Sequence, residues 1–141
     1  MNERRKTIYL AGPLFTHAEL DYNCKLKDML LKIGFPVFLP QEDAEDAIVE
    51  REKQNQECIF KKCVRGVDSS DIVVAVLDGV DVDSGTAWEI GYAYAKEKPI
   101  IGLRTDFRTL SEGIVNLMVE MSIVALAIDE DELLKVLEKF R

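Results

Sequence analysis

Two carboxylates, Asp83 and Glu89, are the residues of this chain best suited to chemistry. They belong to the run Asp-Ser-Gly-Thr-Ala-Trp-Glu-Ile-Gly-Tyr-Ala at 83–93, which indicates a helix that begins with Ser84 as its cap. The apolar run before it, at 72–77, is typical of a buried parallel strand. We therefore expect both carboxylates at the carboxyl end of a strand, where open α/β sheets bind ligands. A carboxylate nucleophile with a second carboxylate as acid or base suits the cleavage of a glycosidic bond.

Each of these groups also has a simpler interpretation. Glu89 is a solvated helix glutamate in that view, although the small residues Gly91 and Ala93 favour a place close to the sheet. Asp83 caps the helix, a role that does not exclude chemistry. Tyr9 lies in the first expected strand, and either its hydroxyl reaches Glu89 or it is a core tyrosine with its hydroxyl at the rim.

Alternating strands and helices must position these side chains. Strands are expected at 7–11, 37–39, 72–77, 99–103 and 123–127. Helices are expected at 17–33, 86–96, 111–119 and 129–140. A further helix is expected after the acidic segment 41–50, which begins as a loop, and should end at about residue 67. This alternation predicts an α/β fold with a doubly wound, five-stranded parallel sheet in the flavodoxin-like order 2-1-3-4-5. Strands one and three are then neighbours, and the loops at 12–13 and 78–83 line one crevice.

Composition limits the possible partners. The 141 residues suit one domain over 1–141, and the net charge of −8 argues against nucleic acid or an anionic membrane as a partner. Cys24, Cys58 and Cys63 form no C-x-x-C pair, so a cytoplasmic setting is expected and a zinc site or disulfide framework is not. The sequence predicts no signal peptide, membrane span or phosphate-binding loop. We expect no metal and no cofactor.

Three segments carry a family resemblance. They are Ile-Tyr-Leu-Ala-Gly-Pro at 8–13, Ser-Asp-Ile-Val-Val-Ala-Val-Leu-Asp-Gly at 70–79, and the run at 83–93, whose pattern is D-[ST]-G-T-A-x-E-x-G-x-A. Together they resemble the nucleoside 2-deoxyribosyltransferase family over about Thr7 to Met118. The third segment is long and specific, whereas the first two alone are weak signals.

The resemblance implies a transfer in two steps. Glu89 matches the glutamate that attacks C1′ of a deoxyribose, releases the base and holds a glycosyl ester, which an incoming base or water then receives. Asp83 matches the aspartate that handles the proton of the base, and Tyr9 matches the tyrosine that orients the nucleophile. The implied substrates are a deoxynucleoside and a free nucleobase, or a deoxynucleotide, and the implied role is nucleotide salvage.

The resemblance also implies a set of substrate-binding residues and a homo-oligomer. An Asn-Leu-Met segment at 116–118 resembles one that completes the site of a neighbouring subunit. One departure from the family pattern is Cys63, at a position where the family often has an aspartate that helps with base recognition or proton transfer. This departure leaves base preference open. The implied substrate-binding residues are Gly12, Phe15, Gln41, Glu42, Gly85, Asn116 and Met118.

Two alternative functions stay open at this point. The first is a deoxynucleoside 5′-monophosphate N-glycosidase, for which Ser84, Thr16 and Arg104 keep a phosphate site possible although Asp83 would repel a phosphate. The second is a module without catalysis that binds nucleotides or resembles a receiver domain. Asp78 resembles a phospho-acceptor at the end of strand three, but strand one ends in Gly-Pro and not in an acidic pair that would hold magnesium.

Overall fold

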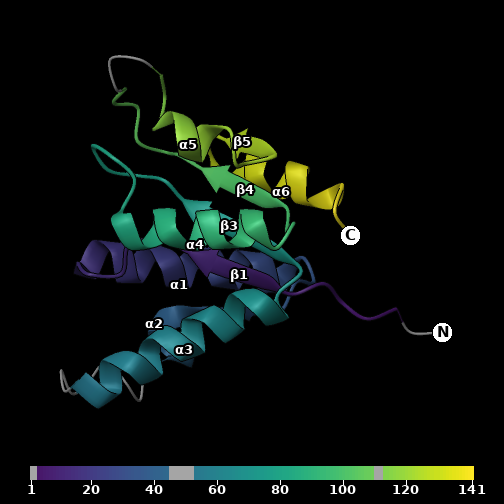
Figure 1. The fold of residues 1–141 in the computed structure, drawn as a ribbon. Helices are drawn as coiled ribbons and strands as arrows, with labels where there is room; N and C mark the ends of the chain where they lie inside the picture. Colours follow the sequence, from purple (N-terminus) through teal and green to yellow (C-terminus); the bar gives the residue numbers. More distant parts are fainter. Residues whose placement is uncertain (1–2, 45–52, 110–112) are drawn as a thin grey trace.

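A five-stranded parallel sheet forms the centre of the computed structural model, which describes residues 3–44, 53–109 and 113–141. The strands follow the order β2-β1-β3-β4-β5 (Figure 1). They are β1 (Ile8–Ala11), β2 (Val37–Phe38), β3 (Ile72–Val76), β4 (Ile100–Leu103) and β5 (Ala125–Ala127). The described helices are α1 (His17–Lys32), α2 (Pro40–Asp43), α3 (Lys53–Ser69), α4 (Ser84–Ala95), α5 (Leu117–Glu120) and α6 (Glu130–Glu138). The predicted fold class and strand order are confirmed.

Helices cover both faces of the sheet. Leu26 and Leu30 of α1 and Leu133 of α6 pack against one face, together with Ile8 and other alternate strand residues. Residues of α3, α4 and α5 pack against the other face, which Tyr9, Val73 and Ala75 present among others. Figure 1 shows α3 and α4 on the side of the sheet opposite α1. Because both faces are covered, every residue of β1 and β3 is buried.

The register of the central strands brings two loops to one edge. Tyr9 pairs with Val73, and Ala11 pairs with Ala75, so β1 and β3 end side by side. Because the strands are parallel, the segments that follow them, at 12–16 and 77–83, leave from the same edge of the sheet. This is the edge at which the sequence predicts a crevice.

Two predicted segments differ from the structure. Residues 41–43 belong to α2 and not to a loop, because Pro40 at the first turn is preorganised for a helix. Residues 45–52, the rest of that acidic segment and the start of the next helix, lie outside the described residues. The helix expected from 111 begins only at Leu117, where the Asn116 side chain accepts a hydrogen bond from the Met118 amide and caps it. Residues 110–112 also lie outside the described part.

Candidate active site

Helix α4 begins at the aspartate of the signature run. Oδ2 of Asp83 accepts hydrogen bonds from the Thr86 amide at 3.0 Å and from the Thr86 hydroxyl at 3.1 Å. The cap is therefore Asp83 and not Ser84, as a carboxylate at the positive end of a helix is favoured. Thr86 is fully buried, so these two bonds hold the Asp83 carboxylate in one position. The cap uses one carboxylate oxygen, which leaves Oδ1 for another partner.

Glu89 lies on α4 and is partly buried. Its Oε2 atom is buried and has no hydrogen-bond partner among the described residues. Burial raises the pKa of this carboxyl to about 7, the negative charge of Asp83 adds to the rise, and the Tyr9 hydroxyl opposes it. The group is thus about half ionised near neutral pH.

Tyr9 brings its hydroxyl to the same place from β1. The side chain is 0% exposed, and within the described part of the chain its hydroxyl makes no hydrogen bond of normal geometry. Burial raises the pKa of the Tyr9 hydroxyl far above its usual value, and the nearby Glu89 and Cys63 raise it further. Of the two interpretations of Tyr9, the structure places the hydroxyl beside Glu89. It stays protonated and is free to donate.

Cys63 is the third member of this cluster and comes from α3. Burial is the main cause that raises the pKa of its thiol, and Glu89 raises it as well, whereas the Tyr9 hydroxyl lowers it. The thiol is therefore neutral at physiological pH. Strand β1 and helices α3 and α4 thus bring together a hydroxyl, a thiol and a carboxyl group that are far apart in the sequence.

The expected substrate-binding residues near the sheet edge fall into two groups. Gly12 and Gly85 mark close approaches: a Cβ at Gly12 would lie 3.1 Å from Cβ of Val76, and one at Gly85 would lie 3.3 Å from Oδ2 of Asp83. Phe15 is exposed to 74%, and Met118 on α5 to 76%. The roles of these four residues in substrate binding stay predictions. The exposed side chains of Phe15 and Met118 are available for contact with a ligand.

Gln41 and Glu42 contact helix α1. The Gln41 amide accepts a hydrogen bond from Asn23 Nδ2 and donates one to the Leu20 carbonyl, both at 3.0 Å. Glu42 forms an ion pair with Lys27. Gln41 Nε2 also donates to Cys24 Sγ at 3.3 Å. A role of Gln41 or Glu42 in binding the base stays a prediction.

Asn23 is a structural residue of this edge that the sequence prediction missed. It is buried, and its Nδ2 also donates to the Pro13 carbonyl at 3.0 Å, which holds the loop after β1. Its position between Leu20 and Leu26 on the apolar stripe of α1 was the signal that could have identified it, because a polar residue there needs partners.

Two reciprocal contacts join the loops after β3 and β4. Arg104, only 4% exposed, donates to the carbonyls of Leu77 at 2.6 Å and Gly79 at 3.2 Å. In return, Asp78 accepts from the Thr105 amide at 2.7 Å and from its hydroxyl at 2.6 Å. Arg104 and Asp78 therefore bind groups within the protein, although the buried Nε of Arg104 has no hydrogen-bond partner among the described residues.

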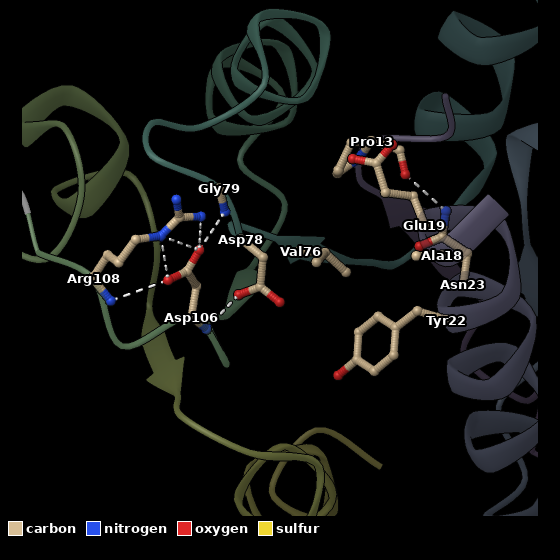
Figure 2. A pocket seen from close by; sticks show the side chains of 10 residues that line it. All are labelled: Pro13, Ala18, Glu19, Tyr22, Asn23, Val76, Asp78, Gly79, Asp106 and Arg108. Atoms are coloured by element: carbon tan, nitrogen blue, oxygen red, sulfur yellow. Dashed lines mark hydrogen bonds and ion pairs between the residues drawn. The ribbon is translucent and has the colours of Figure 1, made fainter. Parts of the chain in front are cut away.

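Two hollows lie near these loops. Figure 2 shows the first, a cavity of about 300 Å³ on the α1 side, where Arg108 pairs with Asp106 and Tyr22 faces the opening. The second, of about 730 Å³, lies between α4 and α5, and Gly91 and Met118 are among its lining residues. Glu89 and Tyr9 line neither of these two hollows.

The described residues contain neither a cluster suited to a metal ion nor a membrane-spanning helix. No group of three or more His, Cys, Asp or Glu side chains in these residues is arranged to hold a metal ion. Within the same residues, no helix is long and apolar enough to cross a membrane.

Known proteins resemble this chain in sequence and in fold. An uncharacterized protein of Ureaplasma parvum serovar 3 is 32% identical over 115 residues, which cover 72% of this chain and 71% of that protein. Among solved structures, a 2-deoxyribosyltransferase from Bacillus psychrosaccharolyticus is 28% identical with a TM-score of 0.79, and the match covers 90% of this chain and 89% of that one. A conserved protein from Enterococcus faecalis V583 is 29% identical with a TM-score of 0.81, over 98% of this chain and 100% of that one.

A more distant structure shares the fold. The CMP N-glycosidase of Clostridium botulinum is 24% identical with a TM-score of 0.58, over 94% of this chain and 99% of that one.

The family model for nucleoside 2-deoxyribosyltransferases matches residues 8–131, which span the sheet, Tyr9, Asp83 and Glu89. The chain belongs to the nucleoside 2-deoxyribosyltransferase family.

Proposed function

We propose that this protein transfers 2-deoxyribose between nucleobases by a double displacement in which Glu89 is the nucleophile. The observation that carries the proposal is the buried Oε2 atom of Glu89, which has no partner in the described chain and belongs to a carboxyl group with a pKa of about 7. A carboxylate oxygen that is buried and has no hydrogen-bond partner keeps its electron pair available for a bond to an electrophilic carbon.

In the proposed mechanism, Glu89, Asp83 and Tyr9 act in two steps. First, a carboxylate oxygen of Glu89 bonds to C1′ of the deoxynucleoside while the C1′–N bond breaks, and the departing base gains a proton through Asp83. Next, a nitrogen of the incoming base attacks C1′, the ester bond breaks, and Asp83 takes up the proton that this nitrogen loses. Tyr9 stays protonated and donates to the carboxylate of Glu89, which orients it for attack.

The contacts of the loops favour an uncharged nucleoside as substrate. A 5′-phosphate would need cationic or hydroxyl partners, but the one cation considered, Arg104, donates to carbonyl groups within the protein. The Thr16 hydroxyl accepts a hydrogen bond from the Glu19 amide as the cap of α1, so only its own proton is left to donate, as in Ser84. The negative charge of Asp83 also opposes a phosphate. Phe15, Gly12 and the chain around Gly85 are then the surfaces that receive the nucleoside.

We further propose that a second copy of the chain completes each site. Leu117, Met118 and Met121 are largely exposed on α5, beside the hollow between α4 and α5. Exposed apolar groups in this number on one short helix are typical of an interface. Asn116 lies at the start of α5, so a neighbouring copy would bring this residue to a substrate.

We also propose that the protein acts in the cytoplasm, with a role in nucleotide salvage.

A base-exchange assay tests the proposal. The protein is incubated with deoxyinosine and adenine, and separately with dGMP alone, and free and exchanged bases are separated by chromatography. We expect deoxyadenosine in the first reaction, and a loss of roughly 10⁴-fold or more in Glu89→Gln, because the nucleophile is removed. Glu138→Gln is the matched control, since Glu138 is exposed and pairs with Arg141 on α6. Release of guanine from dGMP without base exchange would instead identify an N-glycosidase.

A further inference from the structure

The ring of Tyr9 is held in place from one side by Phe38. The two residues are register partners on the neighbouring strands β1 and β2. Their rings are stacked, with centroids 5.3 Å apart and an angle of 12° between the planes. The Tyr9 side chain is completely buried, so its ring has little freedom once Phe38 is fixed. The position of the Tyr9 hydroxyl therefore depends on the position of the Phe38 ring.

Phe38 is in turn held by the backbone of α3. Gly66, near the end of that helix, is buried against the ring. A Cβ atom at this position would lie 2.8 Å from Cε1 of Phe38 and 2.9 Å from both Cδ1 and Cζ. The added Cβ would clash with three atoms of one rigid ring, so the whole ring would have to move. Glycine is unfavourable inside a helix, and the contact with Phe38 supplies a physical reason for its presence here.

We propose that Gly66 is a positioning residue of the candidate active site: it lets α3 lie directly on Phe38, and Phe38 fixes the Tyr9 hydroxyl beside Glu89. Nothing in the chemistry of the transfer requires a residue at 66. Its action passes through two aromatic rings, from α3 to β2 and then to β1. The consequence for turnover rests on the proposed function, whereas the consequence for the Glu89 carboxyl does not.

The direction of the effect follows from the groups around Glu89. Asp83, at the start of the same helix, raises the pKa of Glu89, and Tyr9 from β1 lowers it. Cys63 from α3 faces Tyr9 and Glu89, and its thiol is neutral. If Phe38 is pushed aside, the Tyr9 hydroxyl loses its place beside the carboxylate. The stabilisation of the ionised form is then lost, so the pKa of Glu89 rises above about 7.

The test is a titration of the Glu89 carboxyl by NMR, in protein labelled with ¹³C at the glutamate carboxyl carbons. Glu89→Gln identifies the resonance. We expect Gly66→Ala to raise this pKa by about half a unit or more, which is roughly a threefold change in the ratio of ionised to neutral carboxyl. Where base exchange is measurable, the acidic limb of the pH profile of kcat should move upward by the same amount.

Gly102→Ala is the matched control. A Cβ at Gly102 would lie equally close, 2.8 Å, to Cδ1 of Leu77 and 3.0 Å from Cδ1 of Ile123. These are the ends of flexible side chains, which can move aside, whereas a rigid ring has to move as a whole. This variant also disturbs the core, but we expect the pKa of Glu89 to stay as in the parent. Equal shifts in both variants would mean a general loss of packing and would overturn the inference.

A second variant keeps the inference testable if Gly66→Ala does not fold. Phe38→Leu removes the stacked ring and should raise the pKa of Glu89 in the same direction. If Gly66→Ala does fold, it should add no further rise in the Phe38→Leu background, because both act through one ring. An unchanged Glu89 titration in Phe38→Leu overturns the inference whether or not the protein has activity. Absence of base exchange with the expected titration shifts would contradict only the proposed function.

Discussion

Replacing Glu89 by glutamine should change how the stability of the protein depends on pH. In the folded chain the pKa of this carboxyl is about 7, against 4.5 for an ordinary glutamate. Between these two values the folded state holds a proton that the unfolded state has released. The free energy of unfolding of the parent therefore falls as pH rises through this window, and the loss is complete above pH 7. Glutamine mimics the neutral carboxyl at every pH, so the variant does not have this loss.

The magnitude follows from the shift of 7 − 4.5 = 2.5 units. At 1.36 kcal/mol per unit, the full effect is about 3 kcal/mol. Roughly 2 kcal/mol of it develops between pH 5.5 and pH 8 by the linkage relation, a range above the isoelectric point near 4.7. The stability of Glu89→Gln relative to the parent should rise by that amount across this range.

Urea unfolding followed by circular dichroism at four pH values from 5.5 to 8 measures this difference. Glu138→Gln is the control, because Arg141 holds the pKa of the Glu138 carboxyl below its usual value. Its difference from the parent should not rise with pH over this range. If the difference in the free energy of unfolding between Glu89→Gln and the parent stays constant from pH 5.5 to 8, the pKa of Glu89 is not raised and the reasoning is refuted.

Three further changes give distinct outcomes. Asp83→Asn keeps the cap of α4 but removes the charge that raises the pKa of Glu89, so the Glu89 carboxyl should titrate at lower pH than in the parent, measured by carboxyl ¹³C NMR. Arg104→Met leaves the buried Leu77 carbonyl without its donor and should lower the free energy of unfolding by about 2–3 kcal/mol, measured by urea unfolding. Leu117→Asp places a charge on the exposed apolar face of α5, and sedimentation velocity should then show smaller species than the parent forms.

The sheet could be predicted from the sequence because each strand is a short apolar run between turn residues, and a helical segment separates it from the next. This pattern leaves few topologies, and order 2-1-3-4-5 is one of two common solutions. In this order β1 and β3 are neighbours, so Tyr9 on β1 lies close to the helix that follows β3 and carries Glu89.

The contacts at the loops could not be predicted in this way, because they depend on side chains whose partners are distant in the sequence. Arg104 follows a strand and carries a charge, which is equally consistent with a phosphate site and with the buried contacts to Leu77 and Gly79 that it makes. Gln41 had a similar ambiguity, and α1 supplied the partners. Gly66 had no local signal beyond its place inside a helix, since its contact is a ring on another element.

Intact-protein mass spectrometry after mixing with a deoxynucleoside tests the central claim most directly. Rapid acid quenching without an acceptor base should trap a species heavier than the protein by one deoxyribosyl group, and peptide mapping should place the group on Glu89. Glu89→Gln should give no such species, while Glu138→Gln should match the parent. Base exchange that proceeds without any adduct, or an adduct on another residue, would contradict a covalent intermediate on Glu89.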